Sequence, residues 1–145
     1  MNSRKIDLHV HSTASDGTLT PAELVAEAKK ADLSAFALTD HDTVAGIAEA
    51  KKEANNYDIE LISGVELSTE YKEKEVHMVG LFLDETNPDL LSHLEKFRDN
   101  RNQKMYIKLQ EAGFPVTEEA LRAMFPDAVL TRAHIARFLL EHGYI

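Results

Sequence analysis

The sequence contains no cysteine in 145 residues. It therefore cannot form a disulfide framework or bind a metal ion through thiolates. No apolar run reaches the roughly 18 to 20 residues that a membrane-spanning helix needs. The N-terminal stretch MNSRKIDLHV also lacks the apolar segment of a secretory signal peptide. These absences exclude the disulfide-stabilised and membrane-spanning classes, and they favour a cytoplasmic location.

Basic residues are outnumbered. The 16 lysines and arginines stand against 25 aspartates and glutamates, which gives a formal net charge of −9 at pH 7. Duplex DNA is therefore excluded as a partner, because it needs a broad basic surface. A small anionic substrate is compatible if metal ions reverse the charge inside a cleft. The length, with 43% hydrophobic and 28% charged residues, is typical of one soluble globular domain.

Strand and helix patterns alternate along the first part of the chain. Strands are predicted at residues 5–10, 35–39, 60–68 and 75–83, and helices at about 21–31, 43–55, 88–112, 117–125 and 131–143. Thr20 and Glu23 form a capping box before the first helix, and Asp42 or Thr43 is expected to cap the second. Strand–helix–strand order predicts a parallel sheet of the α/β class.

The connection between the third and fourth strands, TEYKEK, is too short for a parallel crossover and predicts a hairpin. After it the composition becomes helical, with Asn87-Pro88 opening a long helix and Gly113 ending it. We therefore divide the chain into a β/α portion, residues 1–86, and a helical portion, residues 87–145.

The stretch DLHVHSTASDG places two imidazoles on the first strand. His9 and His11 are two residues apart, so both point to one face of the strand and can converge on one metal ion. By itself the H-x-H pattern is a weak signal, because a polar strand face would look the same.

Ionisable residues also lie at the ends of the next strands. Asp40 and His41 follow the apolar FAL of the second strand, where β/α folds place their active sites. Glu66 lies inside VEL, where a buried acid is costly unless it is paired or bound to metal. His77 lies in the otherwise apolar EVHMVG, which the hairpin returns to Glu66. Together these residues predict a metal site.

Other charged residues have simpler interpretations. His93 and His142 lie on helices among charged residues and are expected at the surface. A solvated helix face is expected for four further basic residues: Arg98, Arg101, Lys104 and Lys108. Arg132 has two interpretations, as a residue that binds phosphate through two hydrogen bonds or as a surface arginine.

Five motifs, DLHVHSTASDGTLTP, ALTDHD, GVELS, VHMVG and TRAHIARFLLEHGY, occur in this order. Together they resemble the polymerase-and-histidinol-phosphatase (PHP) family, and within it the stand-alone bacterial phosphoesterases of the nucleotide phosphatase and short-RNA exonuclease group. The resemblance implies a distorted (β/α)7 barrel with a helical insertion that begins near Asn87. It also implies two or three divalent metal ions, manganese, zinc or iron.

The resemblance implies a role for each residue of the motifs. His9 and His11 would bind a first metal, with Glu66 bridging to a second. His77 and His134 would complete the second site, and His41 with Asp16 would serve a third. Asp40 would orient ligands, and Asp40 and His41 are the expected catalytic residues, with Arg132 binding substrate. The implied activity is hydrolysis of phosphate esters, of a small nucleotide or short RNA, by a metal-bound hydroxide.

One family motif has no counterpart here. The family carries an Asp-x-His near its C-terminus, whereas no aspartate follows His134. Several barrel strands also lack counterparts, so we expect an incomplete barrel, either a piece of a longer protein or a chain that covers its open edges by self-association. A catalytically silent metal-binding PHP module and a metal-dependent amidohydrolase are the alternative functions.

Overall fold

The computed structural model describes residues 5–126 and 128–145. Its sheet has the strand order β1-β2-β3-β4, formed by β1 (Lys5–Val10), β2 (Leu33–Leu38), β3 (Glu60–Tyr71) and β4 (Lys74–Leu81). The first three strands are parallel, and β4 pairs antiparallel with β3. The predicted parallel sheet and the predicted hairpin are both confirmed.

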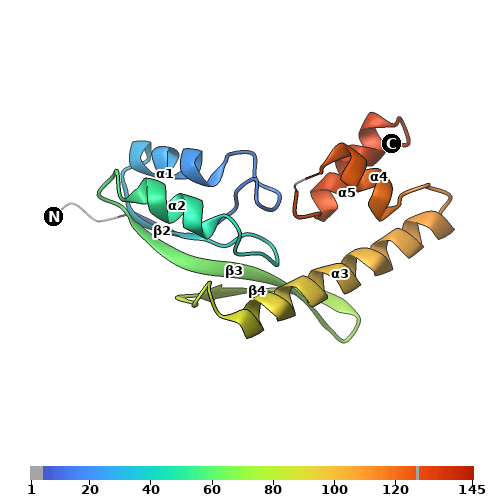
Figure 1. Cartoon of the computed structure of the whole chain (residues 1–145), viewed down its shortest axis with the longest axis horizontal. Coiled ribbons are helices and arrows are strands. Elements are labelled where there is room, and N and C mark those ends of the chain that lie inside the picture. Colours follow the sequence, from blue (N-terminus) through green and yellow to red (C-terminus); the bar gives the residue numbers. More distant parts are fainter. Residues whose placement is uncertain (1–4, 127) are drawn as a thin grey trace.

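Helices α1 (Pro21–Lys30) and α2 (Ile47–Ala54) cover one face of this sheet (Figure 1). Alternate residues of the strands point to that face, so Phe36 of β2 and Val65 of β3 are buried against the helices. Residues at the alternate positions point the other way: Ala37 of β2 and Ile62 of β3 belong to a small separate cluster on the opposite face. That opposite face is the one that carries the site.

The predicted capping box at the start of α1 is confirmed. Thr20 accepts a hydrogen bond from the backbone N–H of Glu23, and the Glu23 carboxylate accepts one from the backbone N–H of Thr20. The predicted cap of α2 is wrong, because this helix begins only at Ile47, with Gly46 as its N-cap. Asp42 is instead fully buried, where it pairs with Arg101.

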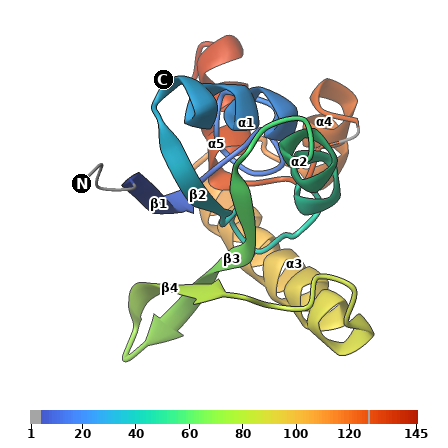
Figure 2. The same ribbon diagram turned by 90° about the vertical axis from the view of Figure 1, so that its left-hand side faces the viewer.

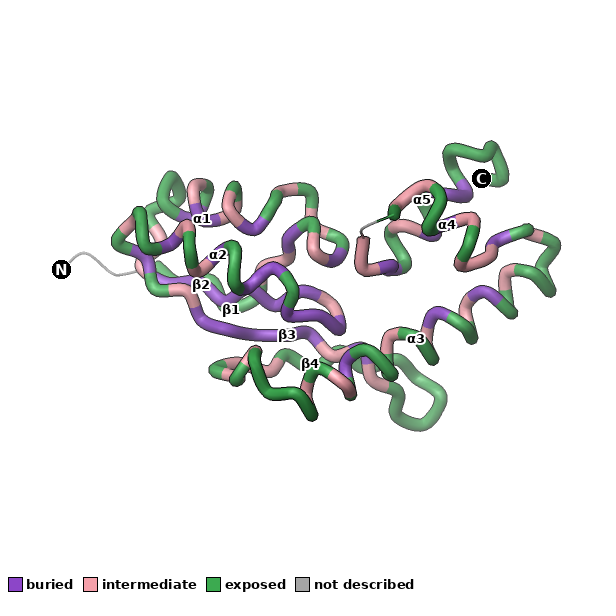
Figure 3. The backbone as a smooth tube through the Cα atoms, in the orientation of Figure 1, coloured by how far each residue is buried: buried purple, intermediate pink, exposed green. Residues whose placement is uncertain are grey.

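The remaining helices are α3 (Pro88–Glu111), α4 (Glu118–Met124) and α5 (Arg132–Glu141). Helix α3 begins beside the sheet and leads away from it, and α4 and α5 turn back along it (Figure 1). These helices bury an apolar cluster of their own, centred on Val116, Leu121 and Ile135. Buried residues recur among exposed ones along α3, as Figure 3 shows.

The sheet is a curled half-barrel of four strands rather than a closed barrel (Figure 2). Both edge strands are largely exposed, with Ile6 of β1 59% exposed and Met78 of β4 57% exposed. Within the residues that the structure describes, no helix is long and apolar enough to cross a membrane.

Candidate metal centre

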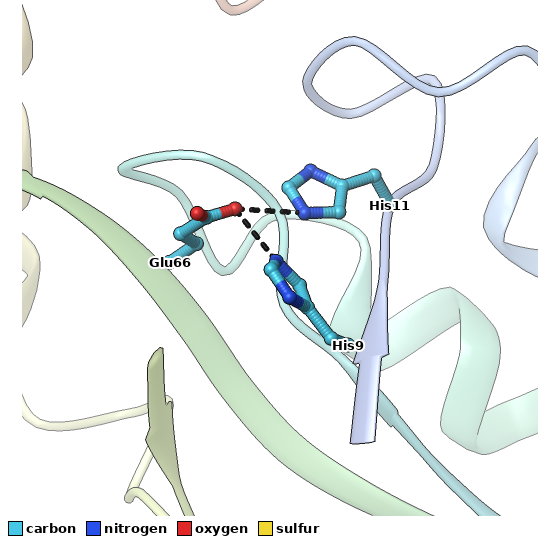
Figure 4. A group of neighbouring side chains, drawn as sticks. All are labelled: His9, His11 and Glu66. Atoms are coloured by element: carbon cyan, nitrogen blue, oxygen red, sulfur yellow. Dashed lines mark hydrogen bonds and ion pairs between the residues drawn. The ribbon is translucent and has the colours of Figure 1, made fainter. Parts of the chain in front are cut away.

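Glu66 lies at the centre of the site. It points from β3 to the face without helices, and it is only 5% exposed. Its Oε2 lies 2.8 Å from Nε2 of His9 and 2.9 Å from Nε2 of His11 (Figure 4). Its Oε1 lies 2.8 Å from Nδ1 of His77 on the neighbouring strand. Three imidazoles therefore converge on one buried carboxylate.

A fourth imidazole joins from the segment that follows β2. Nδ1 of His41 lies 3.6 Å from Oε2 of Glu66, and its Nε2 lies 3.5 Å from Oδ2 of Asp16. The other oxygen of Asp16 lies 3.1 Å from Nδ1 of His11. The Asp16 carboxylate thus lies between two imidazoles on the loop side of the cluster.

The cluster is suited to hold divalent metal ions. It contains three overlapping donor groups: His9, His11 and Glu66; His11, Asp16 and His41; His41, Glu66 and His77. Within each group the ligand atoms lie within 4.8 Å of one another, close to the roughly 4 Å between opposite ligands of an ion with bonds of about 2.1 Å. Among the described residues, His41 Nδ1 is buried without a hydrogen-bond partner, as expected of an atom reserved for a metal.

The protonation of the cluster also suits metal binding. Burial acts to raise the pKa of Glu66, but hydrogen bonds with His9 and His77 outweigh it and hold the pKa below its ordinary value. Burial lowers the pKa of His41, which favours the neutral imidazole that binds metals. The site therefore offers an ionised carboxylate and at least one neutral ring nitrogen near neutral pH.

Asp40 does not point into the cluster. Its buried carboxylate accepts hydrogen bonds from the backbone N–H of Ser12 at 2.7 Å, from Ser12 Oγ at 2.7 Å and from Ser15 Oγ at 2.6 Å. These bonds fix the loop that follows β1. Asp40 thus holds the segment that carries His11 and Asp16, which matches the ligand-orienting role expected for it better than contact with a substrate.

Asp42 and Arg101 form a buried ion pair that the sequence interpretation missed. The Asp42 side chain is 0% exposed and accepts from Arg101 Nη1 and from the backbone N–H of Ser68 at 2.9 Å. Arg101 Nη1 also donates to Ser68 Oγ at 2.9 Å. The predicted solvated face is therefore wrong for Arg101, since its side chain is 13% exposed. No sequence pattern distinguished it from the exposed Lys104 on the same helix.

A second pair joins the hairpin to α5. Nη1 of Arg132 donates to Oε2 of Glu75 at 2.6 Å, and Nη2 donates to Oε1. Glu75 Oε1 also lies 2.8 Å from Nε2 of His77. The hydrogen bonds from Arg132 lower the pKa of Glu75 to about 2. The hydrogen bond to Glu75 raises the pKa of His77 above its ordinary value.

The structure does not bring His134 into the three donor groups. Its Nδ1 accepts a hydrogen bond from the backbone N–H of Thr131 at 3.2 Å, at the start of α5. In a neutral imidazole the proton then lies on Nε2, which leaves no lone pair there for a metal. His93 and His142 are exposed, as predicted, and each Nδ1 contacts a carbonyl of its own helix.

A cleft of about 220 Å³ opens beside the cluster. Its lining combines metal-site residues with both arginines: Asp16, His41, Ser68, His77, Arg101, Thr131 and Arg132. The predicted substrate-binding Arg132 therefore lines the same cleft as His41 and His77, at the start of α5.

Comparison with known proteins decides the family. The PHP domain family matches residues 7–142. The chain belongs to the PHP family.

Its relatives include enzymes that act on nucleotides and RNA. The chain is 43% identical over 146 residues to a 5'-3' exoribonuclease of Haemophilus influenzae, covering 99% of this chain and 53% of that protein. It is 37% identical over 144 residues to a 3',5'-nucleoside bisphosphate phosphatase of Chromobacterium violaceum, covering 97% and 50%. The chain thus spans about half the length of these PHP relatives.

Solved structures share this PHP fold. One, described as a candidate metal-dependent phosphoesterase of Bifidobacterium adolescentis, matches with a TM-score of 0.80 and 30% identity, over 99% of this chain and 52% of that one. Another, described as an amidohydrolase of Chromobacterium violaceum with bound sulfate and no metal, matches with a TM-score of 0.78 and 36% identity, over 97% and 51%.

Proposed function

We propose that this protein is a metal-dependent phosphoesterase whose substrates are small phosphorylated nucleotides or short RNA. The observation that carries the proposal is the convergence of four imidazoles, His9, His11, His41 and His77, on the buried carboxylate of Glu66. The names of the exoribonuclease and phosphatase relatives point to the same chemistry. In the whole protein we propose the distorted (β/α)7 barrel that is expected of the family.

Two or three divalent ions, of manganese, zinc or iron, would bind at the three donor groups. Glu66 would bridge ions held by His9 and His11 on one side and by His77 on the other. His41 and Asp16 would hold the ion on the loop side. His134 as a ligand stays a prediction without support from this geometry. When bound, such ions lower the pKa of a coordinated water and neutralise phosphoryl oxygens.

The chain's own residues would bind and orient the phosphate. Arg132, with the planar guanidinium that matches phosphate oxygens, lines the cleft beside His77. Asp40 would act by fixing the loop of His11 and Asp16 through its bonds to Ser12 and Ser15. Arg101 and Arg132 border the cleft, each paired with a carboxylate. The N–H groups of Arg132 that do not contact Glu75 would bind the anion.

The amidohydrolase alternative has one observation in its favour, the description of a structural neighbour. The silent-module alternative fits less well, because a module without activity has no reason to keep this nearly complete set of first-half donors. Cytoplasmic location and self-association stay predictions.

The test is hydrolysis by the purified whole protein, with its barrel complete, and with manganese added; residues 1–145 alone should turn over poorly. We expect release of phosphate or nucleotide from a 5'-phosphorylated dinucleotide or from adenosine 3',5'-bisphosphate, and loss of that activity with excess chelator. Cleavage of N-acyl amides in place of phosphate esters would favour the amidohydrolase. Manganese binding without hydrolysis of either class would favour the silent module.

A further inference from the structure

One carboxylate outside the proposed ligand set contacts two functional groups at once. Glu75 is on β4, two residues before His77, and its side chain is 38% exposed. Its Oε1 lies 2.8 Å from Nε2 of His77 and also accepts from Nη2 of Arg132. Its Oε2 accepts from Nη1 of Arg132 at 2.6 Å. A metal-ligand candidate and a phosphate-binding candidate therefore share one partner.

The contact with His77 fixes which ring nitrogen faces the cluster. Nδ1 of His77 lies 2.8 Å from Glu66, whereas Nε2 faces Glu75. If a metal ion took the Nδ1 lone pair on the Glu66 side, the proton of the neutral ring would lie on Nε2, where Glu75 is placed to accept it. Carboxylates that accept from the second nitrogen of a ligating histidine orient the ring and raise its basicity.

The contact with Arg132 leaves this side chain able to bind an anion. A guanidinium has five N–H donors, and the pair with Glu75 uses two of them. Arg132 is the first residue of α5, and the pair joins this helix to the hairpin beside the cleft. Glu75 therefore restrains the long Arg132 side chain at the cleft without taking all of its donors.

We propose that Glu75 is a positioning residue that holds both the His77 ring and the Arg132 guanidinium in place for their roles in the site. The inference rests on the proposed function, since it takes His77 as a metal ligand and Arg132 as a phosphate-binding residue. Glu75 is itself neither a metal ligand nor a phosphate-binding residue, and it acts through His77 and Arg132.

The first test measures metal affinity in the absence of substrate. Glu75→Ala removes the acceptor from His77, and we expect its dissociation constant for manganese, measured by competition with a chelating indicator, to rise about 10- to 100-fold. Glu70→Ala is the matched control, because Glu70 pairs with Glu75 across the hairpin and is likewise exposed. Its affinity should stay that of the unsubstituted protein.

The second test measures inorganic phosphate binding by the manganese-saturated protein. Removing a negative charge near an anion site should by itself tighten phosphate binding. Glu70 does not line the cleft, so Glu70→Gln should leave phosphate binding unchanged. For Glu75→Gln we expect weaker binding, because Arg132 loses its restraint. Arg132→Gln should also weaken binding, and the double variant should be no weaker than Arg132→Gln alone, since the two residues act as one unit.

The outcomes separate this inference from the proposed function. Manganese binding by Glu75→Ala that equals that of the unsubstituted protein would overturn the role toward His77. Tighter phosphate binding by Glu75→Gln would overturn the role toward Arg132. Failure of the unsubstituted protein to bind manganese would overturn the proposed function and this inference together.

Discussion

In the β/α region, residues 5–86, two helices pack on the sheet and bury one apolar core, which Leu94 of α3 also joins. The rest of the helical region, residues 88–145, buries a second core of its own. Around the site the two regions meet through charges, in the pairs Asp42–Arg101 and Glu75–Arg132. The β/α region thus supplies the converging metal-ligand candidates, and the helical region supplies the cations that border the cleft. The helical region is therefore positioned both by the apolar contact of Leu94 with the first core and by charged pairs around the site.

The largest effect is expected inside the β/α region, at Glu66. Glu66→Gln removes the one charge shared by His9, His11 and His77, so we expect loss of two ions together, seen by elemental analysis of the purified protein. Metal ions contribute several kcal/mol to hydrolysis, so activity should fall by about a thousandfold or more.

Glu60→Gln is the control for this substitution, because it makes the same change at the exposed start of the same strand. Loss of a single ion, with the other retained at full occupancy, would contradict a bridging role of Glu66.

A smaller effect, on stability, is expected at the buried Asp42–Arg101 pair that links the two regions. Arg101→Met leaves the fully buried Asp42 carboxylate without its cation, and breaking a buried pair in this way costs about 3–5 kcal/mol. We expect the free energy of unfolding, from urea titration, to fall by this amount. Arg122→Met is the control, since it breaks an exposed pair with Glu118 on α4 that contributes only about 0.3–0.5 kcal/mol.

Equal losses in the two arginine variants would show that the Asp42–Arg101 pair is no more important than a surface pair. The comparison of the regions would then have to rest on the two apolar cores alone.

The sequence predicted the β/α region well because its signals are local. Alternating apolar residues, the Thr20–Glu23 capping box and the short TEYKEK turn each specify structure within a few residues. Strand periodicity also put His9 and His11 on one face, where both contact Glu66. Topology then brought His77 to the same carboxylate.

The helical region was less predictable because its role depends on distant partners. Arg101 and Lys104 look alike in sequence, yet only Arg101 meets a buried acid 59 residues away. Asp42 fits the pattern of a helix cap, but its φ of +50° and its bonds to Arg101 and Ser68 place it elsewhere. Such contacts are decided by how the two regions pack, which no local pattern specifies.

Asp40 offers a test of how the β/α region fixes its own loop. Asp40→Asn replaces a charged acceptor of three hydrogen bonds, each worth more than a neutral one, so we expect about 1–3 kcal/mol lower stability in urea titration. Manganese affinity should fall because Asp16 is less well placed. The pH profile of hydrolysis should keep its shape, because Asp40 does not exchange protons with the substrate.

Asp58→Asn, which changes an exposed carboxylate before β3, is the control for Asp40→Asn. A pH profile that loses one limb in the Asp40 variant would instead assign Asp40 to acid–base catalysis.

The smallest effect on stability is expected at the exposed ion pair between Arg132 and Glu75, whose side chains are 44% and 38% exposed. Exposed pairs contribute about 0–1 kcal/mol, so Arg132→Gln should change stability near pH 7 very little. The pKa of Glu75, about 2 in the folded protein, should rise in the variant toward the ordinary value of about 4.3. It should stop short of that value, because His77 still contacts the carboxylate.

The sign of the pH effect follows from the lowered pKa. A carboxyl group with a lowered pKa in the folded state adds stability above its unfolded pKa, and that stability is lost as the pH falls from about 4.3 toward 2. Because solvent screens this exposed pair, the pH-dependent stability should amount to no more than about 1 kcal/mol, and the Arg132 variant should lose most of it. The measurement is an NMR titration of the Glu75 carboxyl carbon in the metal-free protein. If Glu75 still titrates near 2 without Arg132, the low pKa comes from His77 on the same strand. No charge then joins the two regions here, and α5 is held at the cleft by its apolar packing.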